Sequence, residues 1–266
     1  MRALRHFACI LRVWEILNKI GSIQMRILVS LFFAVAFSLP VHGSNRQLSD
    51  HTENVLLHVL SHELGHALIR EFDLPLLGNE EVIADEFATI FLHDRFPDQA
   101  GAIISARVDA FLLEKDDETI FAEHSDDARR AGRATCLLFG LDPQRYLEWA
   151  QRLGMTGQEA KHCVESAPEI ARGWRRVLAP LAMPPTVPTT EVRVIFGEGP
   201  MKMAMENSRA FQQMKKILES FDWHSQITLH GDHCDEGASW SRGRRRILLC
   251  DDYVLRFEEQ ARLLSQ

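Results

Sequence analysis

Residues 50–72 read DHTENVLLHVLSHELGHALIREF, and this stretch decides the fold. Its apolar side chains recur at the three- and four-residue spacing of a helix. Asp50 followed by Glu53 resembles a capping box at the start of that helix. Turn signals follow Phe72, with a proline and a Gly-Asn pair in the next seven residues. The sequence therefore predicts a long helix that ends near Phe72.

Within this helix, His62 and His66 lie four residues apart. Both imidazoles then leave one face of the helix toward a single point, where two ring nitrogens can hold zinc. Glu63 lies beside them, where it can polarise a metal-bound water. The pattern His-Glu-x-x-His arises by chance about 0.04 times in a chain of this composition. The alternative interpretation is that these three residues are polar side chains on a solvated helix face.

The third zinc ligand is predicted from the next segment. Asn79 can cap a second helix, and a helix–turn–helix hairpin then lays Glu81 opposite the two histidines. Asp85, one turn further on, is placed to accept a hydrogen bond from a ligand histidine and so fix its ring. Glu80 and Glu86 compete with Glu81 for the ligand role, and Asp85 could itself bind the metal.

Two further histidines have weaker functional interpretations. His58 lies one turn before His62, but a fourth protein ligand would close the position that a catalytic zinc leaves open. We therefore expect His58 to be a neighbour of the site. His124 could donate a hydrogen bond to a tetrahedral oxyanion, with a structural or surface role as the alternative. Neither Tyr146 nor Tyr253 lies in a recognisable motif.

The stretch HELGHALIREFDLPLLGNEEVIADEFAT, residues 62–89, resembles the zinc-binding hairpin of gluzincin-type zincin metallopeptidases. It is most similar to a bacterial family of putative metallopeptidases known as a domain of unknown function. The resemblance implies general-base catalysis by Glu63 and support of a histidine by Asp85. It also implies one zinc ion per chain, held by His62, His66 and Glu81.

The rest of the chain predicts an α+β fold. We expect a mainly helical zinc-site region over 44–180, a Pro-rich linker over 181–190, and a smaller mixed α/β region over 191–266 with a disulfide-closed β-hairpin. Further helices are predicted over 98–114, 127–140, 143–154, 166–179, 203–221 and 252–264, and strands over 191–196, 227–230 and 246–250.

The first 43 residues read as a leader. Residues 27–39 form an uncharged run that is shorter than the ~20 residues of a membrane-spanning helix, and Arg26 precedes it as the basic flank of a signal peptide. We expect cleavage between Gly43 and Ser44, no stable membrane span in the mature chain, and a secreted or periplasmic protein. Residues 1–24 are interpreted as a gene-model extension before a start at Met25, with an amphipathic anchor as the alternative.

Four cysteines follow the leader. In an oxidising compartment an even number suggests two disulfides. We favour the local pairings Cys136–Cys163 and Cys234–Cys250, each worth roughly 3 kcal/mol on the chain-entropy model. A metal cluster that includes the histidine before Cys163 and the histidine before Cys234 is the alternative, but the C-x-x-C spacing is missing.

Charge argues against one class of partner. The chain of 266 residues has 30 bases and 37 acids, and its first 43 residues hold five of the bases and one of the acids. The remainder therefore has 25 bases, 36 acids and a net charge of −11. Because an acidic protein repels a phosphate backbone, we expect no nucleic-acid partner.

These patterns together predict an exported zinc-dependent metallopeptidase, a hydrolase that acts on a peptide or protein by Glu-assisted attack of zinc-bound water. Two alternatives remain. One is an exported zinc-site protein without peptidase activity, acting as an envelope binding or assembly factor. The other is a metallohydrolase that acts on a non-peptide amide. The sequence predicts no cleavage preference and no oligomeric state.

Overall fold

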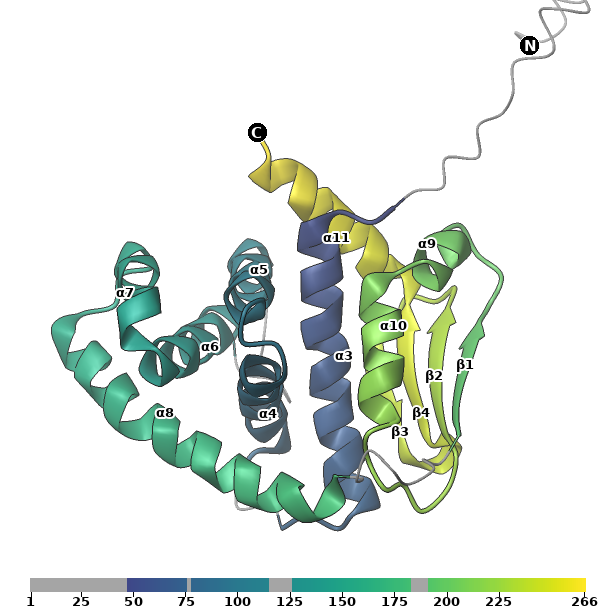
Figure 1. Cartoon of the computed structure of the whole chain (residues 1–266). Coiled ribbons are helices and arrows are strands. Elements are labelled where there is room, and N and C mark those ends of the chain that lie inside the picture. Colours follow the sequence, from purple (N-terminus) through teal and green to yellow (C-terminus); the bar gives the residue numbers. More distant parts are fainter. Residues whose placement is uncertain (1–46, 76–77, 115–125, 183–190) are drawn as a thin grey trace, which may run out of the picture. The chain divides into compact units, whose positions relative to one another are not determined.

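The computed structural model describes residues 47–75, 78–114, 126–182 and 191–266 (Figure 1). The predicted leader and residues 183–190 of the predicted linker lie outside these ranges. Six helices come first: α3 (Asp50–Glu71), α4 (Glu80–Arg95), α5 (Ala100–Leu113), α6 (Asp127–Leu141), α7 (Pro143–Arg152) and α8 (Gly157–Leu178). Strands and helices then alternate as β1 (Val192–Phe196), α9 (Lys202–Glu206), α10 (Arg209–Leu218), β2 (Ile227–Asp232), β3 (Ala238–Ser241), β4 (Arg246–Cys250) and α11 (Asp251–Leu264), with short 3-10 turns at Ala179–Leu181 and Arg242–Arg244.

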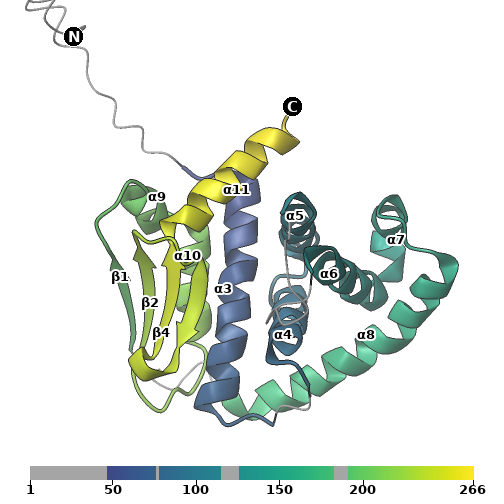
Figure 2. The same cartoon turned by 180° about the vertical axis from the view of Figure 1, so that it is seen from behind.

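Helix α3 lies between two groups of elements. It packs against α4 and α5 on one side and against α10, α11, β3 and β4 on the other (Figures 1 and 2). Leu56, Leu60 and Leu64 are fully buried, and His62 and Glu63 are buried with them. Sixteen of the 22 residues of α3 are buried, and the exposed ones, Asp50 and Arg70, lie near its two ends. The polar side chains of α3 must therefore find their partners on neighbouring elements.

The start of α3 differs from the predicted capping box. Ser49, not Asp50, is the N-cap residue. Glu53 is buried and points to the start of α10 instead, where it accepts a hydrogen bond from the Ser208 hydroxyl at 2.8 Å and two more from backbone N–H groups at 2.8 and 3.0 Å. These N–H groups have no partner within their own helix, and a carboxylate complements the positive end of the helix dipole. Glu53 therefore joins α3 to α10.

The same capping chemistry changes two other predicted helices. The helix predicted over 203–221 is split into α9 and α10, because Ser208 serves as the N-cap of α10. The helix predicted over 166–179 begins earlier, at Gly157, where Thr156 and Glu159 form a capping box.

The four described strands form one mixed sheet in the order β1-β2-β4-β3. Strands β1, β2 and β4 are parallel, and β3 pairs with β4 as an antiparallel hairpin. Helix α10 lies between this sheet and α3 (Figure 1). The predicted α+β class, with a mainly helical part and a smaller C-terminal α/β region, is confirmed.

One hydrophobic cluster connects the sheet with helices α3 and α4. It contains Leu64 of α3 and Phe87 of α4 together with Leu229 of β2 and Ile247 of β4. The sheet is therefore packed on the same core as the hairpin of α3 and α4. Among the described residues, no helix is both long enough and apolar enough to cross a bilayer.

Both favoured disulfides are present. Cys136–Cys163 joins α6 to α8, and Cys234–Cys250 closes the loop that contains the β3–β4 hairpin. Because all four thiols are used in these bonds, the alternative of a metal cluster that includes these cysteines is wrong. Two disulfides are consistent with an extracellular or periplasmic protein.

Candidate metal centre

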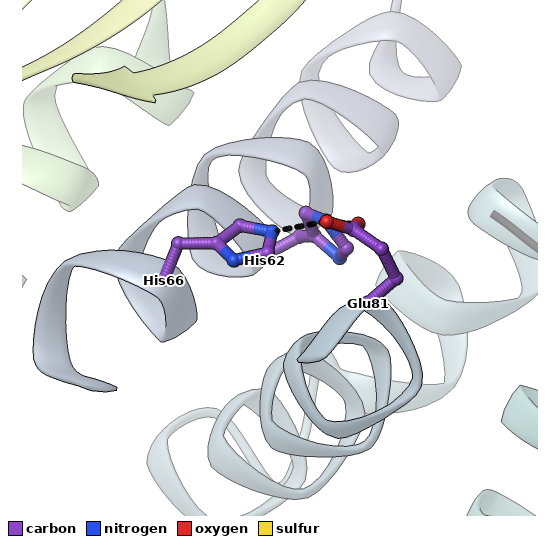
Figure 3. A group of neighbouring side chains, drawn as sticks. All are labelled: His62, His66 and Glu81. Atoms are coloured by element: carbon purple, nitrogen blue, oxygen red, sulfur yellow. Dashed lines mark hydrogen bonds and ion pairs between the residues drawn. The ribbon is translucent and has the colours of Figure 1, made fainter. Parts of the chain in front are cut away.

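The candidate site begins with two histidines on α3. His62 and His66 lie one turn apart, and their rings meet edge to face with centroids 4.8 Å apart (Figure 3). Their Nε2 atoms are 3.1 Å from each other. The two nitrogens thus converge on one point, as their spacing predicts.

Helix α4 brings a carboxylate to the same point. Glu81 lies in its first turn, with Oε2 at 3.1 Å from His62 Nε2 and Oε1 at 3.3 Å from His66 Nε2 (Figure 3). A close approach of the two helices makes this possible. A Cβ atom added to Gly65 would lie 3.2 Å from the Cα of Ala84, so the glycine of the motif lets α4 pack directly against α3.

These three side chains fit a tetrahedral metal. His62, His66 and Glu81 each offer one ligand atom, and these atoms all lie within 4.8 Å of one another. Zinc–ligand bonds of 2.0–2.1 Å in a tetrahedron place neighbouring ligand atoms about 3.3 Å apart. The separations of 3.1 to 3.3 Å agree with that length. The donor set of two imidazoles and one carboxylate is that of a catalytic zinc site.

A buried ion pair, which we call the inner pair, lies behind His62. It consists of Asp85 of α4 and Arg130 of α6, whose guanidinium donates two hydrogen bonds to the carboxylate at 2.8 and 2.9 Å. Asp85 in turn accepts a hydrogen bond at 2.8 Å from His62 Nδ1. Nδ1 is therefore the donor of this bond, which orients Nε2 toward the candidate metal position.

A second pair, the outer pair, stands behind His66. Glu80 accepts a hydrogen bond at 2.9 Å from His66 Nδ1 and another at 3.1 Å from Arg70 Nε. Glu80 therefore orients the ring of His66 through Nδ1, as Asp85 orients the ring of His62. Glu86 has no such contact with either histidine within the described part of the chain. Of the competing acids, only Glu81 faces both Nε2 atoms.

The electrostatics of the site favour a cation. Burial by itself lowers the pKa of His62, but hydrogen bonds with Asp85 and Glu81 outweigh it and raise the pKa to about 9. The pKa of Asp85 is held well below its usual range, because hydrogen bonds with His62 and Arg130 overcome the opposite effect of burial. A site that binds a proton this tightly stabilises positive charge at the histidine nitrogens.

Two cavities flank the candidate centre. The inner cavity, about 670 Å³, is lined by the inner pair and by residues of α5 and α11. The outer cavity, about 510 Å³, is lined by the outer pair and by β3. Three residues line both cavities, and they are His62, Glu63 and Ala238. Glu63, buried and next to the histidines, is therefore accessible from either side.

The other predicted residues have different positions. His58 is buried beside the site, with Nε2 at 3.4 Å from the Thr89 hydroxyl, and does not join the ligand group. Its pKa is lowered to about 3, first by burial and then by the charge of Arg107. His124 lies outside the described residues.

Sequence reasoning missed several residues that surround the site. Arg130 and Arg107 line the inner cavity, as does Tyr253 of α11. Trp240 and Arg242 line the outer cavity. None of these lies within 25 residues of the histidine motif, and no periodicity connects them to it. Arg70 of the outer pair was missed as well, although its i, i+4 spacing from His66 places the two residues on one helix face.

Comparison with known proteins gives one match. A family model described as "Putative metallopeptidase" matches residues 22–178, more than half of the chain. These residues include α3, α4 and α6, and therefore the three candidate ligands, Glu63 and both pairs. The sheet and α11 lie beyond the matched residues. No curated protein and no solved structure matches the chain.

Proposed function

Because this chain belongs to the family of putative metallopeptidases DUF4344, we propose that it is an exported zinc-dependent peptidase that hydrolyses peptide bonds in peptides or proteins. The family supports a peptidase-like hydrolase with a metal. We add zinc as the metal, export from the cytoplasm, and a role for each side chain. The convergence of two histidine nitrogens and one carboxylate beside a buried glutamate is the observation that carries this proposal.

His62, His66 and Glu81 would hold the zinc ion. When bound, zinc supplies a Lewis acid that polarises the scissile carbonyl and lowers the pKa of water. The inner and outer pairs hold the two imidazole rings through their Nδ1 atoms, so the Nε2 atoms keep their direction toward the metal position. This fixed geometry limits the reorganisation that metal binding requires.

Glu63 acts as the general base and then as the general acid. Its carboxylate takes a proton from the attacking water and delivers it to the nitrogen of the leaving amine. Its place on the lining of both cavities supports this role, because a peptide in either cavity can reach this carboxylate.

The surroundings suit an extended peptide. Three residues of β3 line the outer cavity, and β3 is an edge strand of the sheet within the described part of the chain. An edge strand offers backbone N–H and C=O groups to an extended peptide, which binds by adding a strand. The two disulfides support the proposed export.

The mechanism is tested by Glu63→Gln. We expect hydrolysis of a validated peptide substrate to fall by about 10²- to 10⁴-fold, because general acid–base catalysis contributes that much, while zinc stays bound. Glu86→Gln on α4 removes the same charge outside the site and is the matched control. Wild-type rates in Glu63→Gln would refute the role of this residue. Zinc binding without hydrolysis of any peptide by the wild-type protein would favour a zinc-site binding factor or a hydrolase of other amides.

A further inference from the structure

Arg107 of α5 lines the inner cavity beside the candidate metal centre. Its side chain is buried, with 4% of the residue exposed. Its Nη1 atom makes no hydrogen bond within the part of the chain that the structure describes. The nearest carboxylate oxygen, on Glu114, is 3.6 Å away, which is an ion-pair distance but too long for a hydrogen bond. A buried cation thus faces the cavity with hydrogen-bonding capacity to spare.

Such an arrangement is unfavourable for the protein alone. A guanidinium has five N–H donors, and burial without hydrogen bonds removes their solvation without replacement. Burial accordingly lowers the pKa of Arg107. Structural residues seldom keep a cost of this kind, whereas binding residues do so because the ligand provides the missing acceptors.

Packing holds this guanidinium in place. Its Cζ atom lies 3.6 Å from the centroid of the buried Phe111 ring, and the Cζ of Arg130 lies 4.5 Å from the same centroid. Arg130 already donates its two side-chain hydrogen bonds to Asp85 of the inner pair. Among the residues that the structure describes, Arg107 is therefore a positioned cation of the inner cavity with an unused Nη1 donor.

The remaining charges of the cavity do not satisfy Arg107. Glu114 is shared with Arg256, whose side chain is about half exposed and lies 3.9 Å from that carboxylate. The other acids that line the cavity are Glu63, Asp85, Asp127 and Glu259. Of these, Asp85 is held by Arg130, and Asp127 lies 3.6 Å from the same arginine.

We propose that Arg107 binds a carboxylate group of the peptide substrate inside the inner cavity. This inference rests on the proposed peptidase function, because Glu63 lines the same cavity and the bond to be cleaved lies next to it. A carboxylate has two oxygens whose spacing matches the planar fork of a guanidinium, and the pair forms two parallel hydrogen bonds. The carboxylate is either the C-terminus of the substrate or an acidic side chain near the cleaved bond.

The test compares three peptides by NMR titration. They are N-acetyl-Ala-Ala-Ala as the free acid, the same peptide as the amide, and N-acetyl-Ala-Glu-Ala amide. Every protein carries Glu63→Gln, so that no peptide is cleaved. We expect at least one carboxylate peptide to bind about tenfold or more tightly than the neutral amide. A preference for the free acid identifies the C-terminus, and a preference for the glutamate peptide identifies a side chain.

Arg107→Met then separates this role from a structural one. The change keeps an apolar stem against Phe111, and we expect the preference for a carboxylate to fall below about twofold while the protein stays folded. Arg107→Lys, which keeps the charge without the fork, should retain part of the preference. Arg175→Met, at an exposed arginine of α8 that pairs with Asp94, makes the same chemical change away from the cavity and should retain all of it.

Two results would overturn the proposal. Equal affinity for all three peptides in the protein that carries only Glu63→Gln would do so, whether or not Arg107→Met folds. A preference that survives Arg107→Met would also do so, since zinc itself can bind a carboxylate. Both results leave the peptidase function standing, because zinc content and the hydrolysis lost in Glu63→Gln are measured separately.

Discussion

On the inner flank of the candidate centre, Asp85 and Arg130 stand behind His62 with 12% and 11% of their side chains exposed. On the outer flank, Glu80 and Arg70 stand behind His66 with 18% and 48% exposed. The chemistry is the same: a carboxylate accepts the Nδ1 proton of a histidine and is held by an arginine. The surroundings differ, and charge interactions are much stronger away from water. The inner flank should therefore matter more than the outer flank for both stability and metal binding.

The largest expected contrast comes from removing the arginine of each pair. Arg130→Met leaves the buried Asp85 carboxylate without its two hydrogen bonds, so the free energy of unfolding should fall by about 3 kcal/mol. Arg70→Met breaks an exposed pair and should cost less than about 1 kcal/mol. Urea denaturation of the metal-free proteins measures both values. Equal losses in the two variants would refute the comparison.

The carboxylates provide the next contrast, in metal affinity. Asp85→Asn and Glu80→Gln both keep an oxygen that can accept the Nδ1 proton and remove only the charge. The residues that hydrogen-bond to metal-binding histidines typically contribute 10- to 100-fold in metal affinity. We expect zinc affinity to fall by about 100-fold in Asp85→Asn and by about tenfold in Glu80→Gln. Competition with a chromophoric zinc chelator measures both values. If Glu80→Gln weakened zinc binding more, burial would not be the deciding factor.

The smallest effect concerns pH and His58. Burial and the charge of Arg107 lower its pKa to about 3 in the folded protein, from 6.5 for the free side chain, and Asp85 opposes this only in part. Between these pH values the unfolded chain binds a proton that the folded chain does not, so stability falls as pH falls. Between pH 6 and pH 5, metal-free wild type should lose about 1 kcal/mol more than His58→Gln. Chemical denaturation at the two pH values checks this, and parallel losses would show that His58 is charged in the folded state.

The sequence was most informative within the α3–α4 hairpin. Spacing along a single helix places His62 and His66 together, and the order E-x-x-A-D relates Asp85 to Glu81 by one turn. These relations depend only on helix geometry. The structure brings the predicted side chains together because the two helices follow each other closely in the chain and Gly65 lets them approach closely.

The sequence was least informative about contacts between elements that are distant along the chain. Arg130 is 45 residues from Asp85, and their contact depends on how α6 packs against α4. The lining of the outer cavity by β3 likewise depends on the packing of the C-terminal sheet against α3. Local propensity carries no information on such packing. The capping box at Asp50 was wrong for a related reason, because Glu53 has a better partner in the distant helix α10.

The most direct test of the central claim is the zinc content of the purified mature protein, for wild type, His66→Ala and His58→Gln in parallel. We predict about one zinc ion per chain in the wild type, its loss in His66→Ala, and its retention in His58→Gln, whose histidine lies on the same helix outside the ligand group. A folded wild-type protein without zinc under non-chelating conditions would contradict the metal centre, as would zinc that remains bound in His66→Ala.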